Sequence, residues 1–258
     1  MRAFVTGATG FLGGRLTEKL LARGDEVVAL VRRDVDLGGA RTVRGDLSDR
    51  EALRDAMRGC DTVFHVAAMY KVGIPRRERD AMFQVNVRGT ENVLEAAADI
   101  PRVVYVSTVN VFGNTRGTVV DETYEREPGD WLSTYDWTKY LAHQVARGRA
   151  NVAIAQPGAI YGPGDHSELG TQLDQARRGK LLFKALADVG VNAVHIDDAA
   201  DGLLLVHDCG RLGESYVLGG EITRLGVMID RVSPRPVRLT LPAAVLKLAI
   251  PPARSSAR

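Results

Sequence analysis

The sequence has few of the features that mark secreted, metal-binding or membrane proteins. It contains only two cysteines, Cys60 and Cys209, in 258 residues. Neither a disulfide framework nor a metal cluster is expected, and a reducing cytoplasm is the expected compartment. The opening residues MRAFVTG already suggest a strand, so no signal peptide is expected. The longest apolar run, 241–253, contains Lys247 and falls short of the roughly 20 apolar residues of a membrane span, so a docking helix is expected there.

The sequence also has little excess of one sign of charge over the other. The formal net charge is +2, and the arginines are spread along the chain, so no nucleic-acid partner is expected. The remaining composition is that of a globular protein, with 45% hydrophobic and 26% charged residues. Such a chain can bury a sizeable core, as one large domain or as one domain with a small lobe.

Short β-rich runs alternate with helical patterns over residues 1–157. Ser48 and Glu51 form an expected capping box ahead of one of the helices. The alternation predicts an α/β fold with a Rossmann-type, doubly wound parallel sheet. After Pro157 the rhythm loosens, so a small substrate-binding lobe, interleaved with the first domain, is expected over 158–258. The expected strands are 3–6, 26–31, 41–46, 62–67, 102–108 and 152–157, and the expected helices are 12–24, 48–59, 82–98 and 133–147.

The turn after the first expected strand has the glycine pattern of a dinucleotide site. In TGATGFLGG, Gly7 allows a tight turn, Gly10 lets the backbone approach a pyrophosphate, and Gly13 lets the helix pack closely on the sheet. The helix N-terminus adds free N–H groups and a positive dipole end, both of which favour phosphate. The expected contacts in this turn are Gly7, Thr9, Gly10, Phe11, Leu12 and Gly13.

The end of the second expected strand bears on which dinucleotide binds. NAD-specific sites place an acidic residue there, whereas Arg32 follows the strand in this chain. A guanidinium suits a 2′-phosphate, so NADP(H) is the preferred cofactor, although the nearby Asp34 leaves NAD possible. Further contacts are expected where the other strands end, at Asp46, Leu47, Ala67, Ala68 and Pro157.

The stretch STYDWTKYLAH contains a candidate acid–base pair. Tyr135 and Lys139 are four residues apart, which makes them neighbours on one helical face. A free phenol has a pKa of about 10, and a nearby ammonium is expected to lower it. Thr108 ends the fifth expected strand, where its hydroxyl could hold a carbonyl oxygen. His65 lies within an apolar strand and is expected to be a core residue rather than a catalyst.

Several segments together resemble the extended short-chain dehydrogenases/reductases, and most closely the branch of the dihydroflavonol reductases. The resemblance implies that Tyr135 is the general acid/base and that Lys139 lowers its pKa and binds the nicotinamide ribose. Thr108 falls where the family places its catalytic Ser or Thr, Asn86 would be architectural, and a homodimer is possible. The matching segments are TGATGFLG, GDL, HVAA, NVRGT, VSTVNVFG, YDWTK, QPGAIYGPGD and VHIDDAADG.

Departures from the family pattern narrow the range of functions expected for this chain. Gln156 and Ala159 replace the Arg and Asn of nucleotide-sugar members, and Val109 and Asn110 replace the Asp-Glu pair of the 4,6-dehydratases. The chain also ends soon after YVLGGE, so the lobe is expected to be shortened. The leading hypothesis is an NADP(H)-dependent oxidoreductase that interconverts a small ketone or aldehyde and an alcohol, with no metal. The alternatives are an NAD-dependent nucleotide-sugar epimerase and a non-catalytic dinucleotide sensor.

Overall fold

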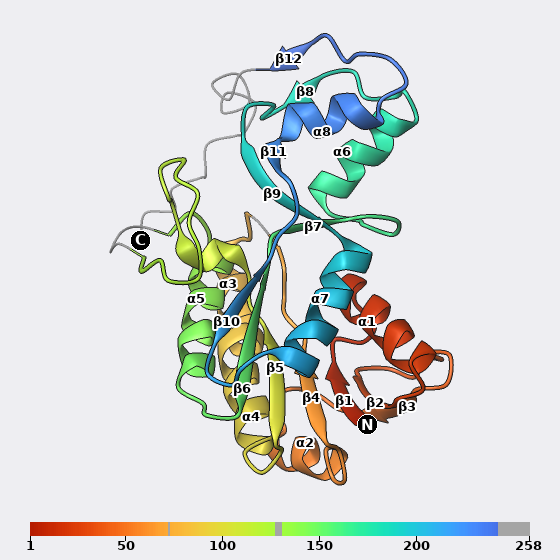
Figure 1. Ribbon diagram of the computed structural model, residues 1–258, viewed down its shortest axis with the longest axis vertical. Coiled ribbons are helices and arrows are strands. Elements are labelled where there is room, and N and C mark those ends of the chain that lie inside the picture. The colour runs from red at the N-terminus through yellow and green to blue at the C-terminus, as the bar shows by residue number, and fades with distance from the viewer. Residues whose placement is uncertain (72, 127–130, 242–258) are drawn as a thin grey trace. The chain divides into compact units, whose positions relative to one another are not determined.

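The computed structural model of the chain describes residues 1–71, 73–126 and 131–241 (Figure 1). They form two compact units, one comprising Met1–Ile160 and Val194–Gly219, the other Tyr161–Ala193 and the residues from Gly220 onward. The boundary expected at residue 157 is close to the first crossing. The segment Val194–Gly219, expected in the small lobe, lies in the first unit instead. The helix expected at 241–253 lies outside the described residues, apart from its first position.

A seven-stranded parallel sheet is the centre of the first unit, with the order β10-β6-β5-β4-β1-β2-β3. Every neighbouring pair is parallel, which confirms the expected doubly wound sheet. The sequence did not predict β10, which extends the sheet beside β6. The strand bounds are β1 (Arg2–Thr6), β2 (Glu26–Val31), β3 (Arg41–Arg44), β4 (Thr62–His65), β5 (Arg102–Val106), β6 (Val152–Pro157) and β10 (Ser215–Leu218).

Helices cover both faces of this sheet (Figure 1). One face packs against α1 (Phe11–Ala22) and α7 (Ile196–Cys209), and the other against α2 (Arg50–Ala56), α4 (Gly89–Ala96) and α5 (Thr134–Arg147). Alternation along β1 shows how the sequence builds the two cores. Ala3 and Val5 face α1 and α7, whereas Phe4 between them faces the opposite core.

The expected capping box ahead of α2 is wrong. The helix begins at Arg50, and its N-cap is Asp49, whose carboxylate accepts a hydrogen bond from the N–H of Ala52. Ser48 lies one residue too early to cap. Its own N–H donates to Oδ1 of Asp46 at 2.9 Å and closes the turn that leads into the helix.

The long helix expected at 82–98 is present, but it starts earlier and changes its winding. It runs through α3 (Arg76–Phe83), the π-helical turn η1 (Gln84–Arg88) and α4. The wide turn contains Asn86, which is only 1% exposed. Its side chain bonds the backbone of Met69 and the hydroxyl of Thr138, so the residue joins the loop after β4 to α5.

The second unit has its own small core, formed by Ala176, Leu225, Ile229 and Val237. Within it, β11 (Ile222–Arg224) pairs antiparallel with β9 (Gly190–His195), and β12 (Thr240–Leu241) pairs parallel with β8 (Lys184–Ala185). Its helices are α6 (Glu168–Arg177) and α8 (Leu225–Val232), and β7 (Ala159–Tyr161) leads into the unit.

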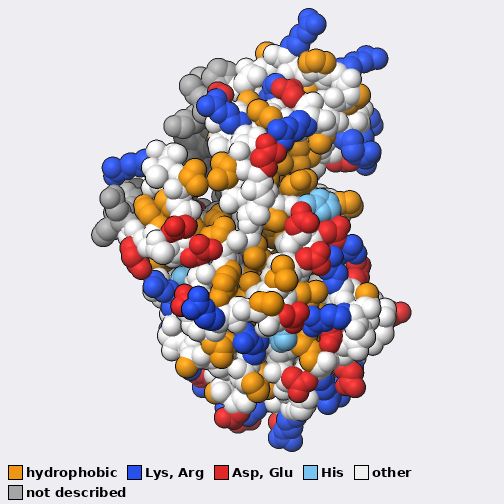
Figure 2. Space-filling view, viewed as in Figure 1, with side chains coloured by type: hydrophobic (Ala, Val, Ile, Leu, Met, Phe, Trp, Pro, Cys, Tyr) orange, Lys and Arg blue, Asp and Glu red, His pale blue; other side chains and the backbone are white. Residues whose placement is uncertain are grey.

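The described residues contain no helix with the length and apolar character needed to cross a bilayer. On the face shown in Figure 2, basic and acidic side chains are interspersed. This mixture agrees with the small net charge of +2.

Candidate active site

The turn between β1 and α1 can be formed only with glycine at two positions. Gly7 has a φ of +74°, and a Cβ there would lie 2.8 Å from the backbone of Ala67. A Cβ at Gly13 would lie 2.1 Å from the carbonyl oxygen of Gly7. The helix therefore packs directly against the turn, which brings its N-terminus to the carboxyl end of β1.

The N-terminus of α1 is open to a ligand. Its N-cap is Gly10, which supplies no side-chain cap, and the first turn contains no acidic residue. The first N–H groups of a helix lack intrahelical partners and attract anions. Thr9 and Gly10 are exposed, so the backbone here is accessible. This arrangement fits the pyrophosphate of a dinucleotide.

The other expected cofactor contacts follow the carboxyl ends of neighbouring strands. Arg32 comes directly after β2 and is exposed, and Asp46 and Leu47 follow β3. Ala67 and Ala68 follow β4, and Pro157 is the last residue of β6. Because parallel strands end at one edge of the sheet, all of these residues lie along the edge that holds the glycine turn.

Thr108 and Tyr135 come together at the same edge. Thr108 precedes the 3-10 turn η2 (Val109–Phe112), where its hydroxyl accepts from the N–H of Asn110 at 3.3 Å. Ser133 caps α5 by accepting from the N–H of Asp136 at 3.1 Å, which fixes the first turn of the helix. The hydroxyl of Thr108 then hydrogen-bonds the phenol of Tyr135.

Lys139 is buried beneath this pair, with 3% of its surface exposed. Its Nζ donates to the carbonyl oxygen of Val106 at 2.7 Å and to Oη of Tyr105 at 3.0 Å. Nζ also lies 4.7 Å from the centre of the Tyr105 ring. Burial disfavours the charged form and lowers the pKa of Lys139 to about 7.

The expectation that the pKa of Tyr135 is lowered is wrong for this structure. Burial raises that pKa above its usual value, and the neighbouring Tyr70 and Asp136 raise it further. The hydrogen bond from Thr108 opposes this shift but is the smaller effect. The reason is that the ammonium of Lys139 faces β5 and is bonded to acceptors there. The phenol instead meets the ring of Tyr70 edge-on, with centroids 4.9 Å apart.

His65 is fully buried, as expected for a core residue, and it belongs to a polar cluster that the sequence did not reveal. Its Nδ1 lies 2.8 Å from Oγ1 of Thr6, and its Nε2 lies 3.0 Å from Oγ1 of Thr90. Burial lowers the pKa of His65 to about 3, so the ring is neutral. Nothing in the spacing of these residues indicates that three separate segments meet here.

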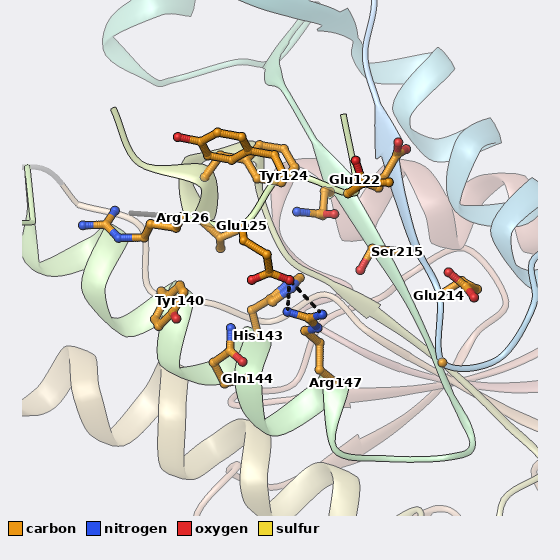
Figure 3. A pocket seen from close by; sticks show the side chains of 15 residues that line it. Glu122, Tyr124, Glu125, Arg126, Tyr140, His143, Gln144, Arg147, Glu214 and Ser215 are labelled. Atoms are coloured by element: carbon orange, nitrogen blue, oxygen red, sulfur yellow. Dashed lines mark hydrogen bonds and ion pairs between the residues drawn. The ribbon is translucent and has the colours of Figure 1, made fainter. Parts of the chain in front are cut away.

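A separate hollow of about 140 Å³ lies against another face of α5 (Figure 3). It is lined by Tyr140, His143 and Arg147 of that helix, and Arg147 pairs with Glu125 at 3.4 Å. Gln156 also lines it, and Nε2 of this buried side chain has no hydrogen-bond partner among the described residues. Neither Tyr135 nor Lys139 contributes to the hollow, so it is distinct from the candidate active site.

The fold and the glycine turn define a Rossmann-type dinucleotide-binding protein with a Thr–Tyr–Lys group at the carboxyl edge of its sheet. The model of the NAD dependent epimerase/dehydratase family matches residues 3–219. The chain belongs to this family and is an NAD(P)-dependent enzyme of the extended short-chain dehydrogenase/reductase type. The family resemblance expected from the sequence is therefore confirmed.

Named relatives cover most of the chain. It is 33% identical to sterol demethylase protein B of Methylococcus capsulatus, over 96% of this chain and 79% of that protein. It is 36% identical to the 4-hydroxy-2-methyl-3-oxo-4-farnesyl-3,4-dihydroquinoline-1-oxide ketoreductase of Stigmatella aurantiaca, over 84% and 68% of the two chains. Among solved structures, DesIV from Streptomyces venezuelae, a dTDP-glucose 4,6-dehydratase with NAD bound, is similar. Its TM-score is 0.77 at 30% identity, over 90% of this chain and 80% of that one.

Proposed function

We propose that the protein is an NADP(H)-dependent oxidoreductase that interconverts a small ketone or aldehyde and the corresponding alcohol. The observation that carries this proposal is the hydrogen-bonded pair of Thr108 and Tyr135 at the sheet edge that also holds the glycine turn. The ketoreductase of Stigmatella aurantiaca, a relative at 36% identity, supports reduction of a carbonyl.

Tyr135, Thr108 and Lys139 each have a separate role in the reaction at the carbonyl. A bound nicotinamide supplies or accepts the hydride at the carbonyl carbon. Tyr135 donates a proton to the oxygen, and its raised pKa keeps the phenol protonated at neutral pH, as an acid requires. When a carbonyl is bound, the hydroxyl of Thr108 would donate its single proton to the same oxygen instead of to the phenol. Lys139 holds positive charge beneath the site, with two of its three N–H groups bonded to β5.

The open helix N-terminus and its glycines would hold the pyrophosphate of the dinucleotide. The preference for NADP(H) rests on Arg32, whose side chain is exposed at the end of β2. Within the described residues no carboxylate forms an ion pair with Arg32, so its guanidinium is available to a 2′-phosphate. Asp46 is exposed at the end of β3, where it could meet the adenine.

The test begins with the cofactor. Purified protein is denatured, and any released dinucleotide is identified and quantified by mass spectrometry. We expect little bound cofactor or partial occupancy by NADP(H), since a co-substrate exchanges on every turnover. Near-stoichiometric NAD would contradict this expectation and favour the epimerase alternative.

Turnover is then measured as NADPH consumption with a panel of aromatic, alicyclic and terpenoid ketones. Tyr135→Phe should reduce kcat by at least about 100-fold, because proton donation contributes on that order. Tyr140→Phe is the matched control, since it removes a hydroxyl from a different face of the same helix. Dinucleotide binding with no turnover of any carbonyl would favour the sensor alternative.

A further inference from the structure

We propose that Tyr105 is a positioning residue for Lys139, and that Thr90 and His65 fix the direction of its hydroxyl. The proposal rests on the function proposed above, because it assigns Tyr105 a part in preparing that site. Tyr105 is 1% exposed and lies on β5, where its hydroxyl contacts Nζ of Lys139. Its neighbours in the cluster are equally buried, since Thr90 is 1% exposed and His65 is 0% exposed.

The hydroxyl of Thr90 is the starting point for assigning the protons. It contacts the backbone carbonyl oxygen of Asn86 at 2.7 Å, and a carbonyl can only accept, so Thr90 donates its one proton there. Any other partner of Thr90 must therefore be a donor. Nε2 of His65, at 3.0 Å, must carry a hydrogen. The hydroxyl of Tyr105, which also hydrogen-bonds Thr90, must likewise donate to it.

The other nitrogen of His65 completes a consistent set. The ring is neutral, so Nδ1 has no hydrogen and accepts from the hydroxyl of Thr6 at 2.8 Å. The oxygen of Thr6 in turn accepts from the N–H of Ala67 at 3.2 Å. Ala67 is the residue whose backbone packs against Gly7. The cluster thus joins the floor of the glycine turn to the residue beside Lys139.

These assignments determine how Tyr105 meets Lys139. Because its proton goes to Thr90, the phenol presents a lone pair to Nζ of Lys139, 3.0 Å away. The carbonyl of Val106 accepts a second N–H at 2.7 Å. No acceptor among the described residues takes the remaining N–H, which is therefore left for a bound molecule. Tyr105 therefore sets both the position of the ammonium and the direction of its free donor.

The charge state of the titratable groups around Lys139 makes the hydroxyl of Tyr105 important for stabilising the ammonium. They are His65 on β4, Tyr105 on β5, and Tyr135 and His143 on α5. Burial lowers the pKa of His143 to about 4 and raises that of both tyrosines, so all four are uncharged at neutral pH. The ammonium is thus stabilised by neutral acceptors, and the loss of one should be measurable.

The experiment is an NMR titration of Lys139 in protein labelled with 13C at the lysine ε-carbon, with the resonance assigned from Lys139→Met. In Tyr105→Phe we expect the pKa of Lys139 to fall by about one unit, because a hydrogen bond to a charged group is lost. The pH limb of kcat that Lys139 controls should move down by the same amount. Tyr140→Phe, which leaves the cluster intact, should shift neither.

An unchanged titration of Lys139 in folded Tyr105→Phe would overturn the proposal. If that variant does not fold, Thr90→Val takes its place, since it removes the acceptor that orients Tyr105. In Thr90→Val the pKa of Lys139 should also fall, and an unchanged pKa would likewise overturn the proposal. The titration needs no turnover. If the wild-type protein reduces no carbonyl but the pKa of Lys139 still falls in Tyr105→Phe, the proposed function is refuted and this inference stands.

Discussion

Two adjacent glycines of α1 should respond to alanine in opposite ways. A Cβ at Gly13 would lie 2.1 Å from the carbonyl oxygen of Gly7, whereas real Cβ contacts are essentially never under 3.0 Å. The helix must therefore move by about 1 Å or the turn must open. Such overpacking costs about 1–3 kcal/mol and occasionally more. Gly13→Ala should lower the free energy of unfolding by roughly 2 kcal/mol, even after the gain in helix propensity.

Gly14 is the matched control. A Cβ there would meet the carbonyl oxygen of Ala8 at 3.5 Å, which is an ordinary contact. Gly14→Ala should therefore gain up to about 1 kcal/mol from helix propensity alone. Urea unfolding of both variants measures the difference, and dinucleotide binding should weaken only in Gly13→Ala, because α1 loses its place behind the turn. A Gly13→Ala protein as stable as Gly14→Ala would refute the close approach of helix and turn.

Two further predictions concern buried polar groups. Gln156→Met should raise the free energy of unfolding by about 1 kcal/mol, because it removes a buried amide nitrogen that has no partner in the part of the chain that the structure describes. Gln144→Met changes an exposed residue of the same hollow and should change that free energy little. The stability of the wild type should rise relative to Lys139→Met as pH increases from about 7 to 10.5, by at most about 1.4 kcal/mol per pH unit. In that window the unfolded lysine still binds a proton that the folded one has released, so stability increases with pH. Chemical denaturation from pH 6 to 10 tests this, and parallel curves for the two proteins would contradict it.

Local signals made most of the fold predictable. Strands β1, β2 and β6 consist mainly of apolar residues, and their bounds match the expectation within one residue. The glycine turn was predictable because its glycine spacing is a short-range pattern: Gly7 takes a positive φ in the turn, and Gly13 packs on the carbonyl of Gly7. In contrast, β10 and α7 return to the first unit from residues 194–219, and no local pattern reports which sheet a distant strand will join.

The candidate site, like the fold, could be predicted from the sequence only in part. Thr108 and Tyr135 could be brought together from the sequence, because strand ends and helix starts meet at one sheet edge in this topology. The hydrogen-bond partner of Lys139 could not be predicted from the sequence. The position of Lys139, four residues after Tyr135, suggested a direct effect on the phenol, but the long lysine side chain reaches β5 instead. Tyr105 gave no signal, because an aromatic residue in an apolar strand looks like ordinary core.

Because its acceptors are neutral, Lys139 has a lowered pKa, which it would not have beside a carboxylate. A buried carboxylate beside it would hold the proton and raise the pKa of the lysine above its usual value. With Tyr105 and Val106 as acceptors, burial dominates and the pKa falls to about 7. In the proposed reaction Tyr135 must regain a proton after each donation, and its own raised pKa makes the phenolate a strong base. A lysine that titrates near neutral pH is a suitable proton source for it. The same burial that weakens the fold below pH 7 thus suits the site to its proposed chemistry.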